Sequence, residues 1–357
     1  MISEEDVKFP NIPFGKTAVL ILIGLVIYFL YLYYFVGFGN LLVLLKSISL
    51  PLLCLALVVS LCGNLFHAAG WWVLLRDTGH RISLGWAYLI YLSSIFFTNL
   101  VPSAAASGEI AKLYFVQKKA GGSRFDRTLA AGIMSRLLEV VPVAVGTILG
   151  VIYVALYYTV PIWVLAFCLL VALLVCFTAV LVLAVCMNAG LLKTLASAVV
   201  SLVSKLFRKG DHSALAEKID ALATQFDGSM REITGKKITI LKALALIMIA
   251  WCFDVTVAYI AFRAIGYQIP PGLVVTIYCI MVLLQLVPIP LPGGLGFLDS
   301  VMPVLYRAMG VDKASANNAT IVTRVVTLWF LTAVGGLVTL YLARMLGTGG
   351  STRPKRE

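Results

Sequence analysis

The sequence predicts an all-α polytopic membrane protein, organised as an inverted repeat with two broken, re-entrant helical hairpins. Three observations lead to this prediction: an apolar composition, several apolar runs of membrane-spanning length, and two Pro/Gly-interrupted regions with matching motifs. Of the 357 residues, 61% are hydrophobic and 12% are charged, whereas soluble domains are about 45–50% apolar and about a quarter charged. A soluble core of this size cannot bury so much apolar surface, but a bilayer can.

Six runs reach the roughly 20 apolar residues that a helix needs to cross the hydrocarbon core. They are Thr17–Phe38, Ser49–Leu75, Leu129–Tyr157, Ile162–Met187, Ile238–Phe262 and Ile321–Leu346. Two further regions, Leu84–Gln117 and Leu273–Met309, are apolar but interrupted by Pro and Gly. The first run follows an acidic start and lacks a basic n-region, so we expect a retained helix rather than a removed signal peptide.

Hydropathy and charge divide the chain into segments with different expected roles. Residues 1–48 form an N-terminal segment with the first span, 49–187 a first membrane repeat, 188–237 an amphipathic basic loop, 238–346 a second membrane repeat, and 347–357 a basic tail. Basic residues gather between 112 and 127, in the 188–237 loop and in the tail. The positive-inside rule places all three on the cytoplasmic side. We therefore expect a multi-pass cell-membrane protein with cytoplasmic termini, in which each interrupted region enters and leaves on one face.

The two interrupted regions repeat one motif. The first reads Asn-Leu-Val-Pro at 99–102 and the second Gln-Leu-Val-Pro at 285–288, and a glycine follows six residues after each proline. In the expected orientation the two copies enter from opposite faces. Inverted repeats with discontinuous helices are typical of secondary transporters, whose binding site lies at the midplane between the breaks. An ordinary extramembrane loop is the alternative for these stretches, but it does not explain the duplicated spacing.

Each copy also carries an arginine inside a long apolar span, 34 residues after the first proline (Arg136) and 36 after the second (Arg324). An arginine at mid-span costs at least about 2.5 kcal/mol on insertion scales, so such residues usually face the bundle interior and serve a function. The planar guanidinium suits phosphate oxygens. The alternative is that both arginines pair with membrane acids: Glu139 lies one turn after Arg136, and Asp254 is a candidate partner for Arg324.

The breaks and the arginines define the expected binding site. The helix that resumes after the second break can direct its N-terminal N–H groups at an anion. The expected substrate-binding residues are Arg136, Arg324, Glu109, Lys112, Asn99, Gln285, Pro288, Gly293, Gly294 and Gly296. The candidates for gating or proton coupling are Glu139, Asp254 and Asp299, although capping of a helix N-terminus explains Glu109 and Asp299 equally well. His67 is expected to be a helix–helix hydrogen-bond donor.

Other site chemistries find little support in the sequence. The segment Gly235-Lys236-Lys237 lacks the earlier glycine and the following Ser/Thr of a phosphate-binding loop, so we do not expect an ATPase. The seven cysteines lie in apolar runs without a C-x-x-C motif, so neither a metal site nor a disulfide framework is predicted. No catalytic constellation is apparent, and we expect no cofactor and no nucleic-acid partner.

Several of these motifs together resemble one known family. They are the Asn-x-x-Pro…Gly-Glu…Lys stretch over 99–112, the intramembrane Arg136, the V-P-x-P-x-P-G-G-x-G segment over 287–296, and the Thr-Arg pair at 323–324. They resemble the lysylphosphatidylglycerol synthase transmembrane-region family, also called the flippase-like domain family, from about Pro51 to Leu346. The first copy, Pro-Ser-Ala-Ala-Ala-Ser-Gly, is poorer in glycine than that family's second-copy pattern.

The resemblance implies a function in lipid handling. Members are fused to, or encoded beside, enzymes that aminoacylate phosphatidylglycerol or glycosylate polyprenyl-type lipids, and their membrane region is thought to move the product across the bilayer. Carried over by motif, Arg136, Arg324, Glu109 and Pro288–Gly296 would line that pathway. We do not expect an aminoacyl-transferring domain within these residues, so the resemblance does not imply lysyl transfer.

The expected function is therefore a flippase-like transporter that translocates an anionic lipid, either aminoacylated or of the glycosylated polyprenyl type. A separately encoded synthetase or glycosyltransferase is a possible partner. The alternatives are a membrane-embedded lipid-headgroup transferase and a non-catalytic partner of a lipid-modifying enzyme. The sequence leaves open the headgroup, the direction of transport, the coupling ion, flippase versus scramblase activity, and the oligomeric state.

Overall fold

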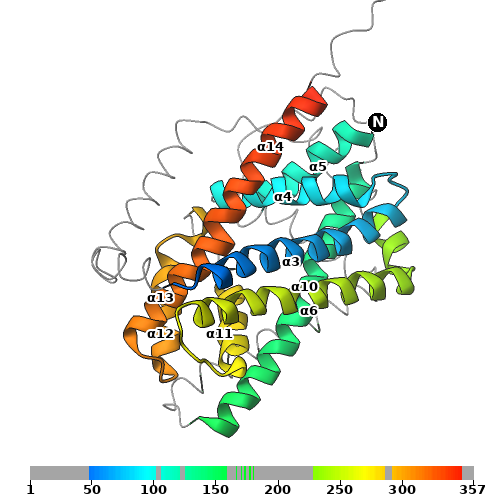
Figure 1. The fold of residues 1–357 in the computed structure, drawn as a ribbon. Coiled ribbons are helices and arrows are strands. Elements are labelled where there is room, and N and C mark those ends of the chain that lie inside the picture. The colour runs from blue at the N-terminus through cyan, green and yellow to red at the C-terminus, as the bar shows by residue number, and fades with distance from the viewer. Residues whose placement is uncertain are drawn as a thin grey trace, which may run out of the picture.

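The computed structural model describes residues 48–101, 106–120, 125–158, 228–285 and 292–347, and the helical backbone at positions 166, 170, 173, 177 and 180. These residues form a helical protein, with no strand in the described part of the chain (Figure 1). The expected first span, nearly all of Ile162–Met187, most of the 188–237 loop, Pro288 and the basic tail lie outside the described residues.

Four helices of the described chain are long and apolar enough to cross a membrane. They are α3 (Leu50–Asp77), α6 (Phe125–Tyr157), α10 (Lys237–Ala264), and a continuous helix made of α13 (Lys313–Arg324), the π-helical η4 (Val325–Phe330) and α14 (Leu331–Gly347). The all-α membrane fold is thereby confirmed, as are the spans expected in these regions. The last helix begins earlier than expected because the Asp312 side chain accepts the Ser315 N–H at 2.9 Å and caps its N-terminus.

Both interrupted regions consist of two short helices. The first contains α4 (Leu84–Leu100) and α5 (Ala106–Ala120), and the second contains α11 (Pro271–Gln285), the 3₁₀ turn η3 (Pro292–Gly294) and α12 (Phe297–Ala308). In the second region, glycines provide left-handed backbone with φ of 56°, 64° and 81° at Gly293, Gly294 and Gly296. Side chains other than glycine rarely adopt such angles, which explains the glycine-rich sequence at this break.

The centre of the protein is an antiparallel pair formed by α3 and α10, which lie side by side in Figure 1. Ser49 N, at the start of α3, donates to Ala264 O at the end of α10 over 2.8 Å. At the other end, Thr239 Oγ1 of α10 donates to Asp77 Oδ2 over 2.9 Å. The helices approach closely because Gly70 of α3 lies against Ile247 of α10, where an added Cβ would stand 2.8 Å from Ile247 Cγ1.

The two central helices also correspond in sequence. After each of them the chain reads Arg-x-x-Gly-x-x-Ile, from Arg76 to Ile82 and from Arg263 to Ile269. The glycines of the two turns, Gly79 and Gly266, are both left-handed, with φ of 95° and 78°. This correspondence, at an offset of 187 residues, extends the repeat beyond the two breaks. The inverted relation of the complete halves stays a prediction.

Each broken region packs on the arginine-bearing helix of the other half: α4 contacts α14, and α11 contacts α6. Glycines make both contacts close. An added Cβ at Gly335 of α14 would stand 2.5 Å from Leu92 O of α4, and one at Gly150 of α6 would stand 2.5 Å from Thr276 Oγ1 of α11. Small residues of this kind let membrane helices approach closely without a hydrophobic driving force.

A polar cluster joins the ends of α3, α6 and α10. Arg127 Nη1 donates to Thr78 O at 2.8 Å, Ser229 Oγ to Asp126 Oδ2 at 2.6 Å, and Lys236 Nζ to Asp77 O at 2.8 Å. These contacts place the start of the 125–157 helix and the end of the 188–237 segment at one end of the bundle. That agrees with the expected common side for the basic connections, whereas which side of a membrane it faces stays a prediction.

Candidate functional site

A cavity of about 700 Å³ lies where the two halves meet, with walls from every described helix of both broken regions and every described spanning helix. Both arginines, both breaks and the central α3–α10 pair contribute to its wall. The charged side chains among the lining residues are Arg136, Arg324, Glu109, Glu139 and Asp254. The remaining wall is mainly apolar, including Val257, Met281, Leu284, Phe297 and Leu331.

The first arginine lies within a network of acids. Arg136 Nε donates to Glu109 Oε1 of α5 at 2.8 Å, and its Nη1 donates to Glu139 Oε2 one turn along α6 at 3.0 Å. The pairing with Glu139, given above as the alternative to a ligand-binding role, is therefore present. The Arg136 side chain is nevertheless 37% exposed, so one of its faces is open to a ligand in the cavity.

Lys112 lies behind this network rather than in the cavity wall. Its Nζ binds Glu109 Oε1 at 2.9 Å and stands 4.7 Å from the ring centroid of Tyr91 and 5.4 Å from that of Trp71. The side chain is only 2% exposed. Lys112 therefore fixes Glu109 through an ion pair and cation–π contacts, and its ammonium does not face the cavity as the expected substrate-binding role requires.

The second arginine pairs with an acid that sequence reasoning assigned to a different role. Arg324 Nε donates to Asp299 Oδ1 at 2.9 Å, and its Nη2 donates to Gly293 O at 2.7 Å. Asp254, named as the candidate partner of Arg324 in the alternative interpretation, is bound to His67 of α3 instead. Hydropathy places both acids near the membrane interior but does not fix how far each helix is rotated about its axis.

Asp299 has two functions in this arrangement. Its Oδ2 accepts the N–H of Gly296 at 2.9 Å, so the expected cap at the start of α12 is confirmed. The same carboxylate neutralises Arg324, and it is only 1% exposed. The N-terminus of α12, expected to receive a substrate anion, thus already holds a carboxylate of the chain itself.

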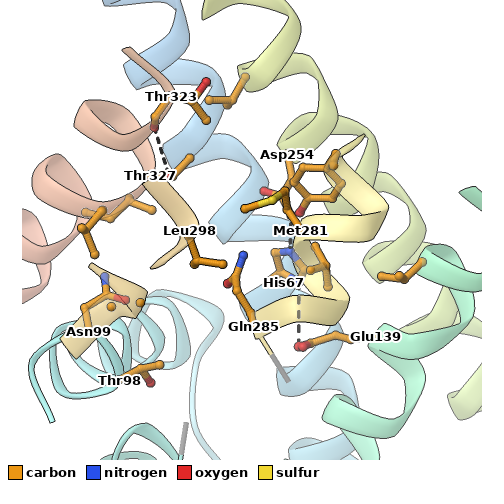
Figure 2. Close-up of a pocket in the computed structure, with 18 of the residues that line it drawn as sticks. His67, Thr98, Asn99, Glu139, Asp254, Met281, Gln285, Leu298, Thr323 and Thr327 are labelled. Atoms are coloured by element: carbon orange, nitrogen blue, oxygen red, sulfur yellow. Dashed lines mark hydrogen bonds and ion pairs between the residues drawn. The ribbon is translucent and has the colours of Figure 1, made fainter. Parts of the chain in front are cut away.

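A third polar group lies at the crossing of α3 and α10. His67 Nε2 lies 2.9 Å from Asp254 Oδ2, which makes His67 the helix–helix contact expected from the sequence. Its Nδ1 faces Glu139 Oε1 at 4.0 Å, so the ring stands between two carboxylates from different helices (Figure 2). Tyr278 Oη of α11 also donates to Asp254 Oδ2, over 3.3 Å.

Some residues of the two helix breaks line the cavity, and others stabilise the helices around it. Asn99, Gln285, Gly293 and Gly294 line the cavity, and Asn99 Nδ2 donates to Thr332 Oγ1 of α14 at 2.9 Å. Gly296 caps α12 and is not among the described lining residues. Pro288 lies outside the described residues.

Several aromatic residues of the cavity wall are not among the residues predicted from the sequence. Tyr278, Trp251 and Tyr306 all line the cavity, and Trp251 Nε1 and Tyr306 Oη are buried without a hydrogen-bond partner among the described residues. Aromatic residues are common in apolar spans, so nothing in the local sequence separates these three from packing residues. The repeat at an offset of 187 residues was a usable signal for Asp254 and His67, since they occupy matching positions.

The chemistry of the cavity follows from its charges. Its two guanidinium groups line one space from different halves. Arg136 is held by Glu109 and Glu139, and Arg324 by Asp299. The planar guanidinium fork donates hydrogen bonds to carboxylate and phosphate oxygens with the same geometry. The surrounding apolar wall suits the part of an amphiphile that adjoins a charged headgroup.

Comparison with known proteins agrees with this architecture. The family model of the lysylphosphatidylglycerol synthase transmembrane region matches residues 18–335. The chain is 25% identical over 322 residues to a UPF0104 membrane protein of Methanothermobacter thermautotrophicus, covering 90% of this chain and 94% of that relative. It is 24% identical over 338 residues to a UPF0104 membrane protein of Pyrococcus horikoshii, covering 93% and 98%. With its helical membrane fold and a family match over most of its length, the chain belongs to the lysylphosphatidylglycerol synthase transmembrane-region family.

Proposed function

We propose that this protein translocates an anionic lipid across the cell membrane, as a flippase-like transporter. The observation that carries the proposal is the convergence of Arg136 and Arg324, from matching positions of the two halves, on one cavity between the halves. An arginine inside a membrane protein is costly, and two that share a cavity indicate a common anionic ligand.

In this proposal the lipid phosphate binds at the arginines and displaces part of their carboxylate partners. The 37% exposed Arg136 is the entry position, whereas Arg324, 8% exposed, responds only after rearrangement of the Asp299 contact. The acyl or polyprenyl chains remain in the bilayer. Aminoacylated phospholipids and glycosylated polyprenyl phosphates both fit this description, because both present a phosphate beside an amine or hydroxyl group.

The proposed route runs along the two breaks. Irregular backbone at membrane depth is tolerated only where it is buried in protein or lines a wet cavity. Asn99 from the first break and Gln285, Gly293 and Gly294 from the second provide polar groups and close backbone approach on this route. A protein that only anchored a partner enzyme would have no need for these groups.

The test uses purified protein in liposomes that contain a trace of fluorescent phosphatidylglycerol or phosphatidic acid. Dithionite, which quenches only the outer leaflet, reports movement between leaflets. We expect the wild-type protein to accelerate this movement, and Arg136→Ala combined with Arg324→Ala to abolish the acceleration. The matched control replaces two exposed arginines away from the cavity, Arg263→Ala with Arg307→Ala, and should behave as the wild type.

Two results would count against the proposal. No acceleration with any of the anionic lipids would favour a headgroup transferase or a partner of a lipid-modifying enzyme. Acceleration that survives in the cavity double variant would separate lipid movement from the two arginines.

A further inference from the structure

We infer that the His67–Asp254 pair is a proton-binding site, and that the protein moves one proton together with each singly charged anionic lipid. The inference rests on the proposed function and adds the coupling ion to it. It starts from the contact between His67 and two carboxylates of the cavity wall, where the side-chain exposures are 15% for His67, 22% for Glu139 and 25% for Asp254.

The geometry leaves one nitrogen of His67 available for a proton. Because the Asp254 carboxylate accepts, the Nε2 of His67 carries the hydrogen of their 2.9 Å contact. Nδ1 is buried and has no hydrogen-bond partner among the described residues, and the same is true of Glu139 Oε1, which lies 4.0 Å away. A proton on Nδ1 would turn this gap into an ion pair between His67 and Glu139.

Charged or titratable side chains from each helix packed against His67 surround its ring. Asp254 faces it from α10, Glu139 and Arg136 from α6, the Tyr91 ring from α4 at a centroid distance of 6.1 Å, and Tyr278 from α11 through Asp254. Two carboxylates therefore face one imidazole. In the empty protein Arg136 holds Glu139 at 3.0 Å, which withholds part of that negative charge from His67.

Binding of an anion at Arg136 changes this balance. A phosphate that takes the Nη1 position displaces Glu139, and the released carboxylate then lies beside the vacant Nδ1 of His67. The imidazolium form becomes favoured, so headgroup binding takes up a proton from the aqueous phase. By reciprocity, a proton on His67 strengthens anion binding by the same factor.

The His67–Asp254 pair lies at the contact between the two halves, so protonation of the pair is coupled to their relative movement. His67 and Asp254 are 187 residues apart, at matching positions of α3 and α10. The neighbouring Phe66 and Phe253 have the same offset, and their rings stack at a centroid distance of 5.3 Å. The two halves thus meet through equivalent residues, and His67 and Asp254 place a titratable pair at that contact. Any movement of one half relative to the other changes the His67–Asp254 contact. Protonation of His67 therefore shifts the equilibrium between the two arrangements of the halves.

The coupling has a specific electrical consequence. A lipid with one negative charge that moves with one proton carries no net charge. Its distribution between leaflets then responds to a pH gradient and not to membrane voltage. With one proton per lipid, a gradient of one pH unit shifts the steady-state ratio between leaflets by up to about tenfold.

The experiment measures leaflet distribution of fluorescent phosphatidylglycerol in proteoliposomes under a one-unit pH gradient, under a potassium-valinomycin voltage, and without either. We expect the wild type to respond to the pH gradient alone. His67→Gln and Asp254→Asn, which keep the size of each side chain, should still move lipid but lose this response. His80→Gln, outside the cavity, is the matched histidine control and should respond as the wild type.

A second measurement avoids reliance on transport. Dioctanoyl phosphatidylglycerol is added to the weakly buffered, detergent-solubilised protein, and proton uptake is followed with a pH indicator. We expect uptake approaching about one proton per bound lipid in the wild type, and none in His67→Gln, which still binds the lipid.

The outcomes separate this inference from the proposed function. Wild-type lipid movement that ignores the pH gradient, lipid binding without proton uptake, or a His67→Gln variant that behaves as the wild type overturns proton coupling and leaves lipid translocation standing. Failure of the wild type to move lipid under every condition overturns both.

Discussion

Arg324 and Asp299 form an ion pair that is almost completely shielded from solvent, with side-chain exposures of 8% and 1%. Removing one partner of a buried pair leaves an uncompensated charge, which typically costs about 3–5 kcal/mol. We therefore expect Arg324→Met to lower the free energy of unfolding by about this amount. Arg324→Met combined with Asp299→Asn should recover most of the loss, since the amide oxygen can still accept the Gly296 N–H.

Thermal or denaturant unfolding in detergent measures these changes, with the exposed Arg307→Met as the control. Equal destabilisation of the single and double variants would mean that the cost comes from lost packing and not from the unpaired carboxylate.

Glu139 competes with any anion for Arg136, because it holds Nη1 at 3.0 Å. Glu139→Gln should therefore raise the affinity of the detergent-solubilised protein for dioctanoyl phosphatidylglycerol by up to about fivefold, since a partly exposed ion pair contributes about 0.2–1 kcal/mol. Isothermal titration calorimetry gives the constants, and Glu232→Gln, in the polar cluster at the end of the bundle, is the control. Weaker binding in Glu139→Gln would show that this acid supports the ligand instead of competing with it.

Close approach of α3 and α10 depends on glycine. An added Cβ at Gly70 would stand 2.8 Å from Ile247 Cγ1 and 3.3 Å from Ala243 O. Gly70→Ala should therefore destabilise the protein by about 1–3 kcal/mol, as overpacking does in other cores. Gly85→Ala, in α4 with nothing within 4 Å of the added Cβ, should be neutral or slightly stabilising. A neutral Gly70→Ala in the same unfolding assay would mean that the two helices can separate without loss.

His80 lies in the turn between α3 and α4. Its surroundings determine how the free energy of unfolding should vary with pH. Thr78 Oγ1 donates to Leu75 O, so it accepts from His80 Nδ1 at 3.0 Å, and Thr128 Oγ1 then donates to Nε2 at 3.1 Å. Burial of this neutral ring lowers the pKa of His80 below its usual value. The unfolded chain therefore binds the proton more readily, and stability decreases as the pH falls below about 6.5.

Unfolding temperatures measured between pH 5 and pH 8 test this, and His80→Gln should flatten the profile. A wild-type profile that rises towards acid pH would contradict the assigned hydrogen-bond pattern. The exposed Asp312 does not interfere in this range, since the Ser315 N–H keeps the pKa of Asp312 below its usual value.

The elements of the fold were largely predictable, because long apolar runs and Pro/Gly interruptions are local signals. Leu129–Tyr157 and Ile238–Phe262 differ from the observed helices mainly at their ends. The pairing of the acids was only partly predictable. Glu139 lies one turn from Arg136 on the same helix, whereas Asp299 reaches Arg324 from another helix through a left-handed glycine turn. The burial of Lys112 between two aromatic rings likewise depends on packing that no local pattern encodes.

The π-helical turn Val325–Phe330 explains why the internal repeat loses its sequence register. Gly146 follows Arg136 by ten residues along α6, which is α-helical throughout and contains Pro142, and Gly335 follows Arg324 by eleven. An added Cβ on these glycines would meet Cys279 and Leu92 respectively, which are themselves 187 residues apart. A π turn contains one residue more than an α turn. It therefore accommodates the additional residue between Arg324 and Gly335, so that Gly335 lies on the same helix face relative to Arg324 as Gly146 does relative to Arg136. A single insertion thus separates the two copies of this helix, and deletion of one residue within 325–330 would restore an ordinary α-helix without moving either end.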